Sequence, residues 1–287
     1  MAFFLNLGFA VAEVFGGLLT NSIAILADAL HDLGDSLALA VSWQLERLST
    51  KNGDGRFSYG YKRFSLLSAL LSGLVLLLGS AFIIFEAVKR LIQPQPSNAR
   101  GMLLFALVGM AVNGYAALRT SRGGNLNSRM ISWHLLEDLL GWAAVFVVSI
   151  ILLFTDLHIL DPILSLALTV FVIYNVLRNL RETLQLFLQG VPESVDIDAI
   201  ETQIRALEKV LDVHHTHIWS LDGEQHVLTT HVQLCLDADR ADVRKIKESI
   251  RALTTQYYLL HTTIEFEFLE DDCSMSANGH IIPQQEK

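Results

Sequence analysis

Six apolar segments dominate the first two thirds of the chain, and each is long enough to cross a bilayer as a helix. A helix that spans the hydrocarbon core needs about 20 mainly apolar residues, and the segments 1–19, 23–43, 66–88, 102–118, 131–154 and 159–176 approach or reach this length. The first segment has no Lys or Arg ahead of it, so it lacks the basic start of a signal peptide and is expected to be a retained helix. The sequence therefore predicts an all-α membrane domain of six helices over residues 1–180.

Basic residues gather on one side of this expected bundle. The positive-inside rule places connections rich in Lys and Arg in the cytoplasm. The connection between the second and third expected helices carries Arg47, Lys51, Arg56, Lys62 and Arg63, and the connection between the fourth and fifth carries Arg119, Arg122 and Arg129. Lys89, Arg90 and Arg100 oppose this arrangement but are outnumbered. We expect an integral protein of the cell (inner or plasma) membrane with both termini in the cytoplasm.

A break at Gly190-Val191-Pro192 separates the apolar part from a region that mixes charged and apolar residues. The patterns there predict a helix over 198–207, strands over 213–220 and 226–235, a helix over 241–256 and a strand over 263–269. Asp222-Gly223 between the first two strands is a hairpin signal. The order αββαβ predicts a small α+β domain over 190–270, followed by a disordered tail over 271–287.

The composition narrows the range of partners. The 287-residue chain is 52% hydrophobic and has a formal net charge of −9. It therefore lacks the basic surface that nucleic acid binding requires, whereas a lipid bilayer and cationic solutes remain as partners. Cys235 and Cys273 form no CxxC pair, so neither a disulfide framework nor a cysteine zinc knuckle is indicated.

Two His-x-x-x-Asp pairs lie inside the expected spans: His31 with Asp35, and His134 with Asp138. Four residues is slightly more than one helical turn, so each pair places an imidazole and a carboxylate on one helix face. Ionisable groups at membrane depth cost roughly 2.5 to 3.5 kcal/mol each unless they pair, face water or bind something. Two such helices facing each other supply four N and O ligands, the set that tetrahedral zinc accepts. We predict a divalent metal site at these four residues.

The types of ligand indicate which metal ions the site binds and whether their transport is coupled to protons. Imidazole favours zinc, cobalt, nickel or copper over magnesium and calcium, and the lack of Met and Cys at these positions argues against copper(I). Histidine binds metal only when neutral, so protons compete with the metal for the same site. Antiport of a divalent metal ion against protons follows as a hypothesis.

Further polar residues lie in the same spans. Asp28 lies three residues before His31, close enough to support the predicted ligands. Asp32 and Glu137 lie about 100° around their helices from His31 and Asp138, so they are expected to face other helices or to lead toward the site. Hydrogen bonds between helices are the expected role of the remaining polar groups, Asn6, Glu13 and Asn113.

The predicted ligands lie in longer stretches that resemble a known family. The segment 22–38, SIAILADALHDLGDSLA, is similar to the second-helix signature of the cation diffusion facilitators, and 134–138 resembles the matching element of the fifth helix. The resemblance continues through Asp161-Pro162-Ile163, Gly190-Val191-Pro192 and the segment 213–220, VHHTHIWS, and covers essentially the whole chain. It implies a homodimeric six-helix exporter of zinc, with cadmium or cobalt tolerated, that is coupled to proton influx and has a metallochaperone-like cytoplasmic domain.

The same resemblance implies metal ligands in the cytoplasmic domain. They are His214, His231 and Glu265, with Glu267 as a companion, and the bound ion would be structural or regulatory. His217, His226 and His261 are expected to be surface or interface histidines. The chain departs from some members at the connection between helices two and three, which carries Asp54, Phe57 and Tyr61 instead of histidines, and at residues 119–129, which contain no histidine. No metal site is expected in either connection.

Two other functions compete with transport. An intramembrane metalloenzyme would use the bound ion to activate water, with His134 and Glu137 and an open coordination position. The chain has no His-Glu-x-x-His helix, however, and two symmetric pairs close the coordination shell. A membrane sensor would bind metal in its tail domain and signal to a partner. The predicted metal ligands inside the membrane spans favour transport over this role.

Overall fold

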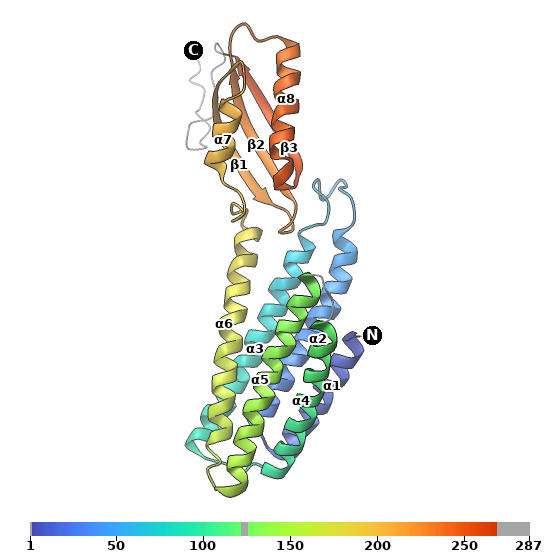
Figure 1. Cartoon of the computed structure of the whole chain (residues 1–287), viewed down its shortest axis with the longest axis vertical. Helices are drawn as coiled ribbons and strands as arrows, with labels where there is room; N and C mark the ends of the chain where they lie inside the picture. Colours follow the sequence, from blue (N-terminus) through green and yellow to red (C-terminus); the bar gives the residue numbers. More distant parts are fainter. Residues whose placement is uncertain (1, 122–125, 269–287) are drawn as a thin grey trace. The chain divides into compact units, whose positions relative to one another are not determined.

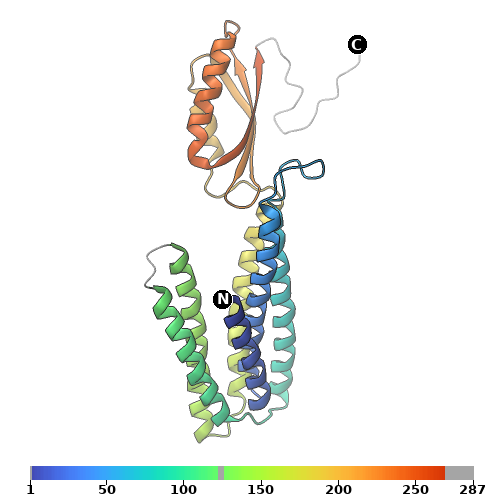
Figure 2. The same ribbon diagram turned by 90° about the vertical axis from the view of Figure 1, so that its right-hand side faces the viewer.

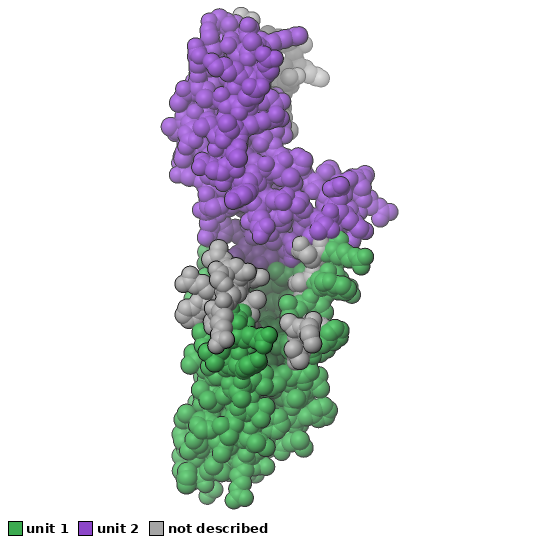
Figure 3. Space-filling model, turned by 45° about the vertical axis from the view of Figure 1, so that its right-hand side comes forward, with its two compact units in different colours: residues 1–47, 67–181 green, residues 48–66, 182–287 purple. Residues whose placement is uncertain are grey.

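The structure is a computed structural model that describes residues 2–121 and 126–268; the side chains at 2, 3, 5, 38, 42, 46, 121 and 126–134 are outside this description. The chain divides into two compact units, one of residues 1–47 and 67–181 and one of residues 48–66 and 182–287 (Figure 3). The connection between the second and third helices thus belongs with the C-terminal residues, which the sequence did not predict. The tail expected to be disordered, 271–287, lies outside the described residues.

The first unit is a bundle of helices. The helices are α1 (Ala2–Thr20), α2 (Ile23–Ser49), α3 (Phe64–Ile92), α4 (Ala99–Ser121), α5 (Leu126–Phe154) and α6 (Leu160–Phe187), of which α2, α3 and α6 run beyond the first unit at one end. They lie side by side, with α4 and α5 forming a pair next to the others (Figures 1 and 2). Their outward faces carry large exposed apolar side chains such as Leu78, Phe82 and Phe85. Such faces suit lipid rather than water.

Within the described residues, four helices are long and apolar enough to cross a membrane. They are Phe64–Ile92, Ala99–Thr120, Leu135–Phe154 and Leu160–Phe187. The apolar helix Asn6–Thr20 is shorter, and α2 carries Asp28, Asp32 and Asp35 within its apolar stretch, which lowers its hydropathy. The expected spans of α1 and α2 therefore stay predictions.

Close helix contacts in the bundle depend on glycine. A Cβ atom added at Gly109 of α4 would lie 2.2 Å from the ring of Trp142 of α5. Trp142 is buried and belongs to a core cluster with Ala106 and Val145. The missing side chain at position 109 lets the indole lie directly on the α4 backbone, as small residues do in membrane bundles.

A buried carboxylate fixes the start of α2. Asp161 at the start of α6 accepts hydrogen bonds from the Ser22 hydroxyl (2.5 Å) and from the backbone N–H groups of Ile23 (2.8 Å) and Ala24 (3.3 Å). The first N–H groups of a helix have no partner within the helix and attract negative charge. One side chain of α6 therefore serves as the N-terminal cap of α2.

The second unit contains a three-stranded sheet covered on one face by helices (Figures 1 and 2). Its elements are α7 (Ile197–Arg205), β1 (Val210–Ser220), β2 (His226–Leu234), α8 (Arg240–Thr254), a short 3₁₀ turn (Thr255–Tyr257) and β3 (Leu259–Phe268). The strand order is β1-β2-β3, with β1 and β2 antiparallel and β2 and β3 parallel. The order helix, strand, strand, helix, strand is the one that the sequence predicts, and Asp222 closes the β1–β2 hairpin by accepting from the N–H groups of Glu224 and Gln225.

A bulge in β1 changes which residues share a face. Val213 and Ile218 both pack in the core under the helices although they are five positions apart, whereas residues on one face of a regular strand are an even number apart. The extra residue lies between His214, which pairs with His231, and His217, which pairs with Thr229. His214 and His217 consequently lie on the same face, opposite the helices.

Asp54 organises the connection between α2 and α3. Its carboxylate accepts hydrogen bonds from the N–H groups of Arg56 (2.8 Å) and Phe57 (2.9 Å) and from the Tyr61 hydroxyl (2.7 Å). The bond from Tyr61 lowers the pKa of Asp54, and the two N–H groups lower it further. The bonds form to the charged carboxylate. They are therefore fully present above the ordinary pKa of an aspartate and are lost as the pH falls through the lowered value.

We expect Asp54→Asn to loosen this connection at neutral pH, because the amide imitates the protonated carboxyl and accepts more weakly. Trypsin should then cleave after Arg56 several-fold faster than in the wild type, measured by mass spectrometry of timed digests of the purified protein. Asn52→Ser in the same connection is the control and should digest like the wild type. Equal rates for Asp54→Asn and the wild type would contradict this role.

Candidate metal centres

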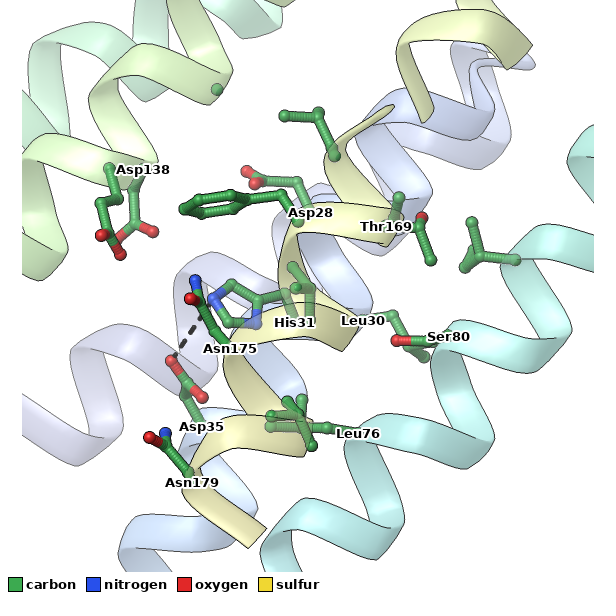
Figure 4. A pocket seen from close by; sticks show the side chains of 18 of the residues that line it. Asp28, Leu30, His31, Asp35, Leu76, Ser80, Asp138, Thr169, Asn175 and Asn179 are labelled. Carbon is green, nitrogen blue, oxygen red and sulfur yellow. Dashed lines mark ion pairs between the residues drawn. The ribbon is translucent and has the colours of Figure 1, made fainter. Parts of the chain in front are cut away.

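A cavity of about 420 Å³ in the first unit collects the polar residues of several helices. Its lining comes from α2, α3, α5 and α6 (Figure 4). His31 and Asp35 of α2 lie one turn apart, with His31 Nε2 3.8 Å from an Asp35 carboxylate oxygen, and each side chain is about a quarter exposed at 22% and 23%. Asp138 projects from α5 toward the α2 residues across the cavity (Figure 4).

Three of the four predicted membrane ligands thus line one cavity. They are His31, Asp35 and Asp138. The fourth, His134, lies on α5 one turn before Asp138, and its side chain is outside the description. Asp28 and Glu137 also line the cavity, which agrees with a position of Glu137 leading toward the site.

Helix α6 contributes polar residues that sequence reasoning did not single out. Thr169, Asn175, Arg178 and Asn179 all line the cavity, and Figure 4 shows Asn175 beside His31 and Asn179 beside Asp35. Asn175 and Asn179 are four positions apart, which is the spacing of one helix face. That spacing inside an apolar segment was the available signal.

Glu13 brings a further carboxyl group from α1. It is 1% exposed and lies close enough to Asp32, Asp28 and Asp138 to interact electrostatically with them. Asn6 of the same helix donates to the Ser36 hydroxyl at 3.1 Å, as expected for a polar residue between helices. The cavity itself is lined by the carboxyl groups of Asp28, Asp35, Glu137 and Asp138, and such a lining favours a cationic occupant.

A second cluster lies on the helix-free face of the C-terminal sheet. His214, His231 and Glu267 each offer a ligand atom, and these atoms lie within 4.8 Å of one another. The Glu267 carboxylate is 2.6 Å from His231 Nδ1 and 3.2 Å from His214 Nε2. Glu265 is largely exposed and lies 3.4 Å from His231 Nε2, so it borders the cluster from the side. All four residues named from the resemblance come together here.

Other histidines of this domain differ from the expectation. His226 is 4% exposed, so it is a buried residue rather than a surface one, and burial lowers its pKa. His215, which the sequence reasoning passed over, lies beside His217 and His231. Partial burial lowers the pKa of His215, and the neighbouring His217, His231 and His214 lower it further.

Comparison with known protein families identifies the chain. Residues 1–188 match the family model of the cation efflux transmembrane domain, and residues 192–267 match that of the cation efflux protein cytoplasmic domain. The chain belongs to the cation diffusion facilitator family. Membership makes this facilitator an integral membrane transporter of metal cations and not an enzyme, so the metalloenzyme hypothesis is wrong.

Curated relatives of this facilitator carry transport names. The zinc transporter ZitB of Pectobacterium atrosepticum is 35% identical over 97% of this chain and 88% of its own length. The cadmium, cobalt and zinc/H(+)-K(+) antiporter of Bacillus subtilis is 30% identical over 93% of this chain and 87% of its own length. The metal cation efflux system protein CzcD of Cupriavidus metallidurans is 31% identical over 90% and 82%. The similarity extends over both units of the facilitator.

Proposed function

We propose that this facilitator exports zinc from the cytoplasm in exchange for protons, with cadmium and cobalt as related cargo. The observation that carries the proposal is the cavity that gathers His31, Asp35 and Asp138 from two helices. His134 would complete a four-ligand site, one turn from Asp138. Two imidazoles and two carboxylates match the donor set and coordination number of zinc. The names of the relatives, which include zinc transport and antiport with protons, support the same cargo and coupling.

Proton exchange follows from the ligands themselves. A zinc ion binds neutral histidine and ionised aspartate, so protons that reach the cavity from the other side of the membrane compete with the ion and favour its release. The additional carboxylates of Asp28 and Glu137 along the cavity wall give arriving cations and protons further places to bind. The six helices α1–α6 would cross the bilayer with both termini in the cytoplasm, because the connections α2–α3 and α4–α5 carry the excess of basic residues.

We also propose that the facilitator works as a homodimer whose cytoplasmic domain binds a metal ion at His214, His231 and Glu267, with Glu265 nearby. The sheet leaves one face without helices, and this face carries the cluster. A partner subunit there would cover both the face and the exposed edges of the sheet. Metal bound at such a site would stabilise the dimer and thereby regulate transport.

The test is zinc flux into sealed proteoliposomes under an imposed pH gradient, compared for the wild type and Asp35→Ala. Gradient-dependent flux that disappears in the variant is the expected result. The fluxes of cadmium, cobalt, manganese and iron(II), measured in the same way, give the order of preference among the transported ions. If the wild type binds zinc but moves no ion in either direction, the proposal is wrong and a membrane metal sensor takes its place.

For the cytoplasmic cluster, we expect Glu267→Gln to weaken zinc binding about 100-fold, the upper end of the range for groups that support a metal site. The substitution removes the negative charge that lies between the two imidazoles. The measurement is competition with a chromophoric chelator, made in an Asp35→Asn background so that the membrane site contributes little. Glu208→Gln, at an exposed glutamate that pairs with Lys245, is the matched control and should bind like its parent.

A further inference from the structure

His215 and His217 lie as a pair at the exposed side of the inner cluster formed by His214, His231 and Glu267. Their Nε2 atoms are 3.4 Å apart and their rings are perpendicular, with centroids separated by 4.6 Å. Hydrogen bonds from a nitrogen donor are usually about 2.7 to 3.2 Å long, so this separation is long for a direct bond between the rings. Two nitrogens bound to one tetrahedral zinc at its usual bond length lie about 3.3 Å apart. The pair has the spacing of two ligands on one ion.

The bulge of β1 produces this pairing. His215 adopts a φ of 53°, in the left-handed region that side chains other than glycine rarely occupy. The hydroxyl of the next residue, Thr216, lies 2.9 Å from that of Thr230 across the strands and holds the bulge in place. Strained backbone of this kind persists where the surrounding structure fixes it, and it often accompanies functional sites.

The chemistry of the pair fits a divalent transition metal. Imidazole is a ligand for zinc, cobalt, nickel and copper. His217 is exposed and His215 partly so, which leaves room for water at the remaining coordination positions.

The pair is distinct from the inner cluster. His214 and His231 are engaged with Glu267, whereas the contact between His215 and His217 does not use that carboxylate. The rings of His215 and His231 are nevertheless adjacent, with centroids 5.0 Å apart. An ion held by the pair would therefore lie next to the inner cluster without sharing its ligands.

We propose that His215 and His217 form a second, solvent-accessible site for a divalent transition-metal ion on the cytoplasmic domain, completed by water. The site exchanges its ion with the cytosol more readily than the inner cluster, because it has only two protein ligands and neither is anionic. It does not depend on transport through the membrane cavity.

The test is equilibrium dialysis of the full-length chain in detergent against Zn²⁺, with the number of bound ions counted by elemental analysis. All variants carry Asp35→Asn. His217→Gln is the principal variant because its side chain is exposed, and His215→Asn complements it because asparagine tolerates the left-handed backbone. His261→Gln, at an exposed histidine of β3, is the control. A His214→Gln and Glu267→Gln double variant removes the inner cluster.

We expect His217→Gln and His215→Asn each to lose one weakly bound zinc ion per chain and to keep the tight one. The double variant should lose the tight ion and keep the weak one, and His261→Gln should keep both. An unchanged number of ions in His217→Gln would overturn the proposal. Loss of both ions in the double variant would also overturn it, because the pair would then depend on the inner cluster. Neither result bears on zinc flux, which is measured separately.

Discussion

Asp138→Asn is expected to reduce zinc flux at least about 100-fold, since loss of even a group that supports a metal ligand lowers affinity or activity by as much as this. Asp138 is the carboxylate that faces the α2 residues from the opposite side of the cavity. An amide of the same shape keeps the packing but removes the charge and one anionic ligand. Flux is measured in proteoliposomes under an inward-directed zinc gradient and an opposing pH gradient.

Controls on neighbouring carboxylates make this result specific. Asp156→Asn, at an exposed position of the connection between α5 and α6, changes the same charge outside the cavity and should transport at the wild-type rate. Glu137→Gln changes a residue that lines the cavity beside Asp138, and we expect a smaller, several-fold reduction. If Asp138→Asn retained half of the wild-type flux, the ligand role of Asp138 would have to be abandoned.

Asp161→Ala is expected to destabilise the membrane unit on the order of 3 kcal/mol, because it leaves three buried donors without their acceptor. The donors are the Ser22 hydroxyl and the N–H groups of Ile23 and Ala24. For a cooperative unit of about 150 to 250 residues, which is the size range of the membrane unit, this loss corresponds to a drop in Tm of about 6 to 12 °C. Thermal unfolding of the purified protein in detergent measures it.

Asp161→Asn separates the two contributions of this carboxylate. The amide oxygen still accepts from the α2 terminus, but the charge is gone, so we expect a smaller drop in Tm than with alanine. Asp156→Ala, in the preceding connection, is the surface control. A Tm for Asp161→Ala within about 1 °C of the wild type would mean that water replaces the carboxylate, and the cap would then contribute little to stability.

Local spacing made much of the fold and of the site predictable. Each His-x-x-x-Asp pair predicts two side chains on one helix face, and the Asp222-Gly223 turn predicts the hairpin of the C-terminal domain. The structure has His31 one turn from Asp35 on α2 and a hairpin closed by Asp222. Where a short segment of sequence determines the geometry, reasoning from periodicity is sufficient.

Features that depend on contacts between distant segments were not predictable in this way. Asn175 and Asn179 line the cavity only because α6 packs beside α2, and the Glu13 carboxyl comes within electrostatic range of those of α2 and α5 only in the packed bundle. The bulge at His215 follows from pairing with β2, which shifts the alternation of β1 by one residue. Nothing in the local sequence fixes that register.

The division of the chain into units has a mechanical consequence. The polypeptide passes between the two units at three places, near residues 47, 66 and 181, which lie in or next to α2, α3 and α6. A displacement of the cytoplasmic unit would therefore act through the backbone on the helices that carry His31, Asp35, Asn175 and Asn179. Helix α5, which carries Asp138, has no direct backbone connection to the cytoplasmic unit, because it is joined to α4 and to the N-terminal end of α6. A movement of the cytoplasmic unit would thus change one wall of the cavity relative to the other.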